Sequence, residues 1–295
     1  HVKNMTPEWA YGITTIKPDQ IRKTAYEMVD AAPAAIVHPG RHVTWYGDDT
    51  QRLRAVAILN ALLGNWGKRG GFYNPEGVKL PKYPHPPYPE PERTWRHAFE
   101  GKYQLAELAL STGICEATIP TVERDCAFKG WIVNGTNLIK TLPNRQQTIQ
   151  AINSLDLIVV VDTMPMEITG YADVVLPECT YLERYDLLRT SKHRDPYLAL
   201  RMPAAPPKYD SKPGWWIAKE LGKRLGLEDY FKYDSIEDLL DWQLKQVGSS
   251  LGEMKKLGVK KFPRKYDDLY YKDNQQVQYK TNSGKIELYS TSFEA

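Results

Sequence analysis

Two short polar stretches stand directly after two apolar runs in the middle of the chain. Asn134-Gly135-Thr136-Asn137 follows residues 131–133, and Asp162-Thr163 follows residues 157–161. Asn-Gly permits a positive φ angle and lets backbone N–H groups approach a ligand closely. A carboxylate only accepts hydrogen bonds, so Asp162 suits paired donors such as a ribose diol or the N–H groups of guanine. The stretches predict a nucleotide site, although a plain turn at Asn134-Gly135 and a helix cap at Asp162 fit the pattern equally well.

The apolar runs before these stretches are predicted to be neighbouring strands of a parallel sheet. They are short, β-branched and continuous, which is typical of strands buried on both faces. Residues 144–155 between them carry apolar side chains on one side, as a covering helix would. A third run, residues 172–176, ends at Pro177. Ligands of such sheets bind outside the carboxyl ends of the strands, so the fold class predicted is α/β, with a Rossmann-like parallel sheet flanked by helices.

A second candidate site lies in the first part of the chain. Residues 34–37 are predicted to form a short strand, with Arg41 and His42 in the loop that follows and Tyr46 just beyond. Arginine suits a bidentate contact with an anion, and histidine exchanges a proton near neutral pH. These residues could contact an anionic substrate. An exposed basic turn, in which Arg41 pairs with a nearby aspartate, is the alternative.

Composition sets limits on the function. The 295 residues are 42% hydrophobic and carry a net charge of +3, which implies no strong attraction to nucleic acid. No apolar run approaches the roughly 18 residues of a membrane span. No signal peptide is visible, but the chain begins at His1, so this says nothing about a parent protein. Cys115, Cys126 and Cys179 are too dispersed for a structural metal site or an iron–sulfur cluster, and Cys115 and Cys126 are predicted to be buried thiols rather than a disulfide.

The order of the patterns predicts four regions. Residues 1–78 read as the C-terminal part of an α/β domain, with helices at 18–29 and 51–63, the second largely buried. Residues 79–110 are a proline-rich crossing segment. Residues 111–230 form the Rossmann-like domain, which carries the predicted nucleotide site. Residues 231–295 contain a helix at 235–246 and a β-hairpin around Asn282-Ser283-Gly284.

Five stretches together resemble the catalytic subunits of molybdopterin oxidoreductases of the DMSO reductase family, in preserved order over nearly the whole chain. YADVVLP followed by Glu183-Arg184, after a strand–helix–strand unit, is a specific motif. PGRHVTWYGDDTQR is most similar to the polysulfide and thiosulfate reductase branch. The five stretches are residues 39–52, 57–71, 132–143, 157–184 and 281–290.

The resemblance implies a cofactor and residues that bind it. The family holds two molybdopterin guanine dinucleotides around one molybdenum or tungsten. By resemblance, Asn134, Gly135 and Asn137 line the nucleotide of one pterin, and Asp162 and Thr163 meet its guanosine end. Further residues are expected to shape or support the pocket, the first of them also explained as a structural cap: Asp173, Pro177 and Glu183.

The resemblance also implies an activity and a setting. The intact protein is expected to reduce a sulfur compound such as polysulfide or thiosulfate, with Arg41 facing the metal-bound anion and His42 or Tyr46 assisting. An iron–sulfur electron-transfer subunit and a membrane anchor subunit are the expected partners, in a periplasmic, membrane-associated complex of a prokaryote, with no nucleic acid. The family's cysteine-rich segment for an iron–sulfur cluster, its protein ligand to the metal and its last domain have no counterpart here. The chain is therefore expected to be a central fragment that is inactive alone.

Two other functions fit parts of the sequence. A nucleotide-binding or regulatory module without catalysis is consistent with the missing metal ligand. A nicotinamide dehydrogenase is disfavoured, because no Gly-x-Gly-x-x-Gly follows a predicted strand.

Overall fold

The computed structural model describes residues 2–40, 49–73, 76–88, 113–121, 127–272 and 275–289. The chain divides into two compact units. One comprises His1–Val78, Ser191–Tyr197 and Lys261–Ala295, and the other Lys79–Thr190 and Leu198–Lys260. We describe each unit by itself.

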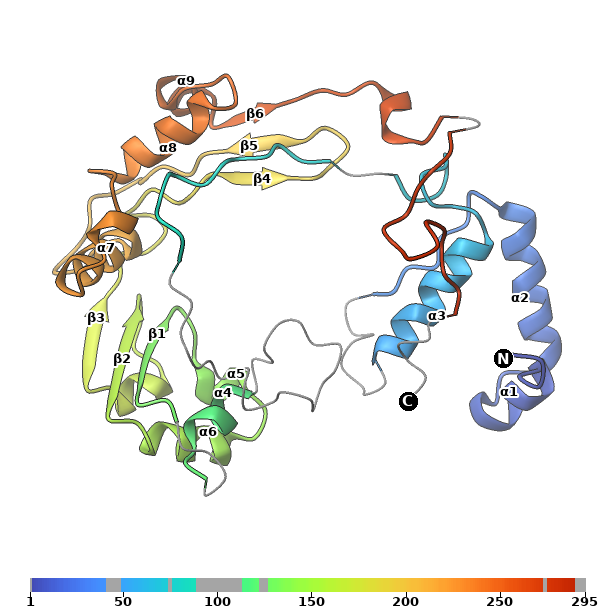
Figure 1. Ribbon diagram of the computed structural model, residues 1–295, viewed down its shortest axis with the longest axis horizontal. Coiled ribbons are helices and arrows are strands. Elements are labelled where there is room, and N and C mark those ends of the chain that lie inside the picture. The colour runs from blue at the N-terminus through green and yellow to red at the C-terminus, as the bar shows by residue number, and fades with distance from the viewer. Residues whose placement is uncertain are drawn as a thin grey trace. The chain divides into compact units, whose positions relative to one another are not determined.

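The second unit is built around a parallel sheet of three strands (Figure 1). The strands are β1 (Gly130–Asn134), β2 (Leu157–Asp162) and β3 (Val174–Pro177), in the order β1-β2-β3. The register pairs Asn134 with Val161 and Asp162 with Pro177, so the strands end at one edge. The predicted α/β class and the predicted parallel strands are confirmed.

Short helices cover one face of this sheet. They are α4 (Gly113–Thr118), α5 (Leu138–Thr141), α6 (Arg145–Asn153) and the 3-10 helix η3 (Glu167–Tyr171). The predicted helix α6 begins where Asn144, as N-cap, accepts from the Gln147 backbone N–H. The core between helices and sheet consists of Cys115, Trp131, Val133, Ile139, Ala151, Ile152, Ile158, Val160 and Ile168.

The sequence predicted strands buried on both faces, and only β2 comes close to this, because its adjacent residues Val160 and Val161 are both buried. Strand β1 is buried on one face. Trp131 and Val133 are buried, whereas Ile132 between them is 62% exposed. Successive crossovers in one direction are right-handed, so both connections lie on the same face. The opposite face depends on other elements of the chain. Helix α7 (Gly214–Arg224) lies beside β3, where Leu176 and Ile217 line a common groove.

This unit also contains α7, η4 (Glu228–Tyr230), α8 (Ile236–Lys245) and α9 (Leu251–Leu257). Of these, η4 and α8 contact the described part of the proline-rich segment. The predicted helix α8 carries a capping box between Ser235 and Asp238. Tyr230 Oη donates to the Pro87 carbonyl at 2.7 Å, and Gln243 Nε2 donates to the Pro81 carbonyl at 2.8 Å. These contacts explain why residues 79–88, which form no helix or strand, have a defined path. Strands β4 (Arg189–Ser191), β5 (Tyr197–Ala199) and β6 (Val259–Lys261) form a second sheet.

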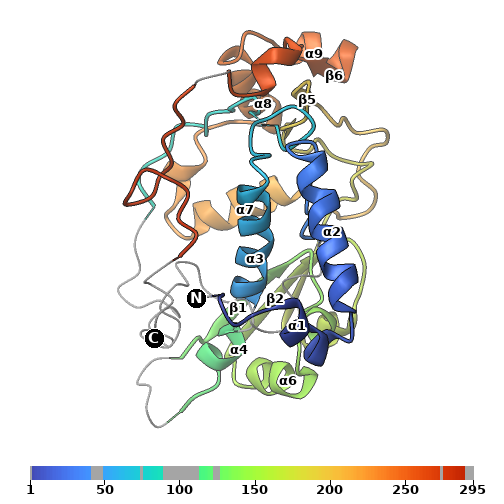
Figure 2. The ribbon, with the colours of Figure 1, turned by 90° about the vertical axis from the view of Figure 1, so that its right-hand side faces the viewer.

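The first unit contains α1 (Pro7–Thr14), α2 (Pro18–Ala31), α3 (Asp49–Leu62) and the 3-10 helix η5 (Tyr266–Leu269). Helices α2 and α3 run side by side in both views (Figures 1 and 2). The predicted helices are present, but α3 is less buried than its apolar sequence indicated. Only Asn60 of its described side chains is buried, and Leu62 is 67% exposed.

The strand predicted at residues 34–37 is absent, because residue 34 is a bend and residues 35–37 have no regular secondary structure and pair with no described strand. The Asn60 side chain takes the place of a strand partner, because its Oδ1 accepts from the Val37 N–H at 2.9 Å and its Nδ2 donates to the Val37 carbonyl at 2.8 Å. Asn65 Nδ2 donates to the Ala35 carbonyl at 2.6 Å. A side-chain amide offers a donor and an acceptor as a peptide group does. Two buried asparagines therefore supply the hydrogen bonds that the backbone of this segment would otherwise make to a neighbouring strand.

Residues 275–289 form a turn rather than paired strands. Tyr279 N donates to the Gly284 carbonyl at 3.0 Å, and Thr281 Oγ1 donates to the Lys285 carbonyl at 2.7 Å. Across the described part of the chain, no helix has both the length and the apolar character needed to cross a bilayer.

Candidate functional site

The carboxyl edge of the parallel sheet brings most of the predicted cofactor residues together. Asn134, Asp162 and Pro177 are the last residues of β1, β2 and β3. Gly135 follows with a φ of +63°, a conformation that L side chains rarely adopt, and its N–H donates to the Val161 carbonyl at 3.0 Å. The sequence prediction that Asn134, Gly135 and Asp162 share one edge therefore agrees with this geometry.

Asp162 offers an unpaired acceptor at this edge. Its Oδ1 accepts from the Thr163 N–H at 2.7 Å. Its Oδ2 is buried and has no hydrogen-bond partner among the described residues. A buried carboxylate oxygen without a donor costs roughly 1–3 kcal/mol or more, so a ligand that supplies a donor here would remove a cost already present.

Asn137 offers a second unpaired acceptor. The residue is 9% exposed, and its Nδ2 donates to Glu167 Oε2 at 2.5 Å. Its Oδ1 is buried and has no partner among the described residues. Lys140 Nζ lies 2.5 Å from Glu167 Oε1, and this contact first, followed by the Glu167 backbone N–H and the Asn137 amide, lowers the pKa of Glu167 to about 2.

The depressed pKa of Glu167 predicts a pH-dependent contribution to stability. A carboxyl with a lowered pKa stabilises the fold above its ordinary pKa, near 4.5, and loses that contribution as the pH falls toward 2. We therefore expect Glu167→Gln to lower the free energy of unfolding at pH 6 and the difference from wild type to shrink between pH 4.5 and 2. Chemical denaturation across this range measures it. A difference that grows on acidification would contradict the prediction.

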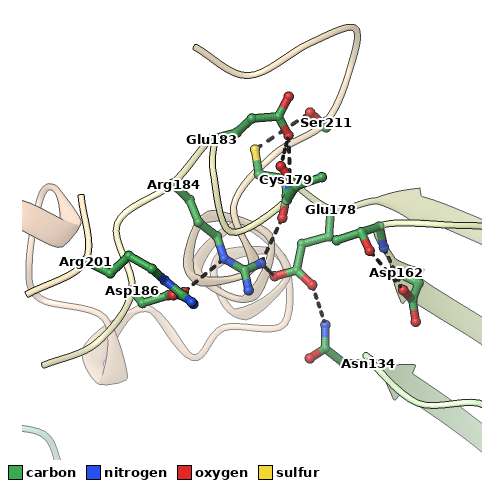
Figure 3. A network of polar contacts seen from close by, with 11 residues as sticks. Asn134, Asp162, Glu178, Cys179, Glu183, Arg184, Asp186, Arg201 and Ser211 are labelled. Carbon is green, nitrogen blue, oxygen red and sulfur yellow. Dashed lines mark hydrogen bonds and ion pairs between the residues drawn. The ribbon is translucent and has the colours of Figure 1, made fainter. Parts of the chain in front are cut away.

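Glu178 is the residue of this edge that the sequence analysis missed. It directly follows β3, its N–H donates to the Asp162 carbonyl at 2.9 Å, and its Oε2 accepts from Asn134 Nδ2 at 3.4 Å (Figure 3). Its side chain is 10% exposed, and its Oε1 forms an ion pair with Arg184. A Cβ at Gly214 would lie 2.5 Å from Glu178 Oε1, so a larger residue at the start of α7 would displace this carboxylate. The position of Glu178 directly after a predicted strand was the sequence signal that could have identified it.

Ion pairs extend from Glu178 along the following loop (Figure 3). Arg184 Nε donates to Asp186 Oδ1 at 3.1 Å, and Asp186 pairs in turn with Arg201. Arg184 also donates to the Cys179 carbonyl at 3.0 Å. Acidic and basic groups alternate along this series, so their charges offset one another. The network fixes the loop that leaves the carboxyl edge.

Two of the residues predicted to shape the cofactor pocket, Asp173 and Glu183, form hydrogen bonds with other parts of the chain. Glu183 accepts from the Thr180 N–H and hydroxyl through Oε2 and from the Lys208 N–H through Oε1. These bonds, the Thr180 backbone first, lower the pKa of Glu183. Asp173 Oδ2 accepts from the Ile158 N–H near the start of β2, at the opposite edge from Asp162. The structure therefore does not bring Asp173 to the other residues, and it ties both carboxylate oxygens of Glu183 into the loop.

The predicted catalytic residues Arg41, His42 and Tyr46 lie outside the described residues, as does Cys126. Cys115 and Cys179 are buried free thiols, and burial raises the pKa of the Cys115 thiol. Within the described ranges, no three His, Cys, Asp or Glu side chains gather in a way that could hold a metal ion.

Comparison with known proteins gives a consistent family. Residues 13–224 match the molybdopterin oxidoreductase family. The chain is 30% identical to the thiosulfate reductase molybdopterin-containing subunit PhsA of Salmonella typhimurium, over 99% of this chain and 43% of that protein. It is 28% identical to the probable dimethyl sulfoxide reductase chain YnfF of Escherichia coli, over 97% of this chain and 38% of that protein. The chain thus spans about two fifths of the length of these relatives.

A solved structure has the same fold. Acetylene hydratase from Pelobacter acetylenicus superposes with a TM-score of 0.73 over 98% of this chain and 42% of that one, at 22% sequence identity. This similarity supports the arrangement of helices and strands described above.

Proposed function

The chain belongs to the molybdopterin oxidoreductase family, and from this premise we propose that the carboxyl edge of β1–β2–β3 binds the guanosine end of a molybdopterin guanine dinucleotide. The observation that carries the proposal is a pair of buried oxygens, Asn137 Oδ1 and Asp162 Oδ2, that have no hydrogen-bond partner within the described ranges. They follow adjacent strands of a parallel sheet, where nucleotides bind in open α/β folds.

The residues at this edge suit that group chemically. A guanosine carries N–H groups on its base and hydroxyl groups on its ribose, which are donors that two acceptor oxygens can use. Gly135 adopts positive φ with open space around its Cα, so the backbone after β1 leaves room for a ligand. In this proposal Asn134 and Gly135 bound the nucleotide, Asn137 and Asp162 accept hydrogen bonds from it, and Thr163 orients Asp162.

The chemistry of the intact protein extends the proposal. When bound, the pterin-held molybdenum or tungsten supplies the redox step, and the protein supplies binding and orientation. The relatives are named for thiosulfate and dimethyl sulfoxide. We propose reduction of a sulfur compound such as thiosulfate or polysulfide, together with an iron–sulfur electron-transfer subunit and a membrane anchor subunit in a periplasmic complex.

Analysis of the intact protein tests this function. Protein purified from a host that makes the cofactor is expected to contain molybdenum or tungsten together with a pterin that releases GMP on acid hydrolysis. An active preparation that contains neither metal nor pterin would refute the proposal.

Arg41 is proposed to hold the anionic substrate, assisted by His42 or Tyr46. Arg41→Lys keeps the charge and removes the planar fork, so the KM for thiosulfate is expected to rise roughly tenfold, as loss of one charge-assisted hydrogen bond implies. Steady-state kinetics on preparations matched for cofactor content measure it. Unchanged turnover and KM at full cofactor loading would leave Arg41 as a residue that pairs within its own turn.

A further inference from the structure

Asn137 occupies a helix N-cap position but does not cap its helix. Asparagine at this position usually accepts a hydrogen bond from the first turn. In α5 the Asn137 side chain makes no such bond, and only its backbone carbonyl accepts from the Lys140 and Thr141 N–H groups. The side chain instead turns toward Glu167, and its buried Oδ1 has no partner in the part of the chain that the structure describes. The orientation of this amide is therefore set by a residue from the loop after β2.

Glu167 dictates which end of the Asn137 amide it meets. An ionised carboxylate only accepts hydrogen bonds, so it faces the NH₂ group and excludes the carbonyl oxygen. Lys140 approaches the other oxygen of the same carboxylate, 2.5 Å from Glu167 Oε1. Lys140 and Glu167 come from the crossovers that follow β1 and β2. The pair therefore commits Asn137 to present its Oδ1 as an acceptor.

We propose that Glu167 is a positioning residue that makes Asn137 an acceptor in the loop after β1, at the edge where β2 ends in Asp162, so that this edge of the sheet selects a ligand with two donor groups. The inference rests on the nucleotide site proposed above and adds the device that sets its specificity. Asn137 Oδ1 and Asp162 Oδ2 are both buried acceptors, and in the described part of the chain neither has a donor. A ligand that presents an acceptor at either position places its own lone pair against that of the buried oxygen. Neither atom then has a donor, so such a ligand binds much more weakly.

Two parts of a guanosine nucleotide could supply the donor pair. The base offers adjacent N–H groups on one edge, and the ribose offers two hydroxyls. Discrimination between GMP and CMP reports recognition of the base, because both carry the same ribose phosphate. Discrimination between GMP and 2′-deoxy-GMP reports recognition of the ribose. In either case the selectivity depends on the orientation of the Asn137 amide.

Glu167→Gln tests whether the Glu167 carboxylate sets the orientation of the Asn137 amide, because Lys140 remains in place beside the substituted side chain. The ammonium group is a donor only, so it takes the oxygen of the substituted glutamine. The glutamine NH₂ then faces Asn137, whose amide must turn over and direct its own NH₂ into the site. Titration calorimetry with GMP, CMP and 2′-deoxy-GMP is expected to show GMP binding weakened roughly 10- to 100-fold and its preference reduced.

Two further variants separate orientation from a general structural effect. Glu167→Asp keeps an acceptor-only carboxylate and is expected to retain the GMP preference. Adding Lys140→Met to Glu167→Gln frees the glutamine to turn its oxygen to Asn137 and is expected to recover part of the affinity. Glu237 on α8 forms an exposed ion pair with Lys255 on α9, so Glu237→Gln makes the same change away from the site and serves as the matched control. A residue with only a structural role would not show recovery in the double variant.

The outcomes are distinct. Wild-type binding with discrimination, its loss in Glu167→Gln and its recovery in the double variant would support the inference. Wild-type binding with the same discrimination in Glu167→Gln would overturn the inference and leave the proposed nucleotide site intact. Absence of GMP binding by the wild-type protein would overturn both. If Glu167→Gln does not fold, the comparison of Glu167→Asp with the double variant decides, since equal selectivity loss in these two would refute an effect of amide orientation.

Discussion

Protein carrying Asp162→Ala is expected to be purified without its guanine nucleotide and without loss of stability. The substitution removes a carboxylate that accepts a pair of charge-assisted hydrogen bonds. Such a pair contributes about 3 kcal/mol to binding, so the dissociation constant is expected to rise roughly 150-fold. Asp162→Ala removes the acceptor of the exposed Thr163 N–H bond, but it also removes a buried oxygen that has no partner among the described residues, so the melting temperature is expected to remain close to wild type. Acid hydrolysis and quantification of GMP per mole of protein, with a parallel thermal scan, measure both effects.

A control for this variant lies at the other end of the same strand. Asp156 immediately precedes β2, is 71% exposed in its side chain and pairs with Lys129. Asp156→Ala is expected to retain full nucleotide content. If both variants keep their nucleotide, Asp162 does not hold it, and if both lose it together with stability, the effect comes from the fold rather than from the carboxylate.

Arg184→Ala is expected to destabilise the second unit by about 3 kcal/mol. The guanidinium lies between Glu178 and Asp186, whose side chains are 10% and 23% exposed, and its removal leaves two largely buried carboxylates without their shared cation. Urea denaturation measures the free energy of unfolding. Because the partly buried charge on Glu178 causes most of the cost, adding Glu178→Gln is expected to recover stability in the double variant.

An exposed ion pair provides the comparison. Arg224 pairs with Glu220 one helical turn away, and its side chain is 68% exposed. Surface pairs of this kind contribute roughly 0–1 kcal/mol, so Arg224→Ala is expected to have little effect. Additive effects of Arg184→Ala and Glu178→Gln would show that the two side chains do not interact and that the network does not fix the loop.

The parallel sheet and its main helices were predictable because their signals are local. Residues 131–133 and 157–161 are short β-branched runs, and the helix between them begins at Asn144, whose side chain caps it. The site at the strand ends follows from the same pattern, because parallel strands that end in polar residues place those residues at one edge. For this reason Asn134, Gly135 and Asp162 could be selected before any coordinates were known.

Features that depend on distant partners were not predictable in this way. The backbone of Val37 is satisfied by the Asn60 amide rather than by another strand, and no periodicity signals such a replacement. Glu178 resembles any acidic loop residue until Arg184 and Gly214 are seen beside it. The exposure of Ile132 follows from both crossovers lying on one face, which is a property of the topology rather than of the strand.

The contact between Asn137 and Glu167 is another feature that depends on distant partners and could not be predicted from the sequence. From the sequence, Asn137 is one polar residue in a loop, and Glu167 lies after the next strand. Only the folded chain shows that the Asn137 amide is held by the Glu167 carboxylate and that its oxygen meets no donor from the described residues. The resemblance to a family indicated that Asn137 contacts the cofactor, whereas the geometry supplies the chemical role proposed for it.

Hydrogen exchange with and without GDP is the most direct test of the claim that the carboxyl edge of β1–β2–β3 is the nucleotide site. Peptides that cover residues 134–142 and 161–169 are expected to exchange more slowly when GDP is bound, because they contain Gly135, Asn137, Asp162 and Thr163. Peptides that cover α8 and α9 serve as the internal reference and are expected to be unchanged. Protection confined to other parts of the chain, such as residues 64–72, or no protection at saturating GDP, would contradict the account.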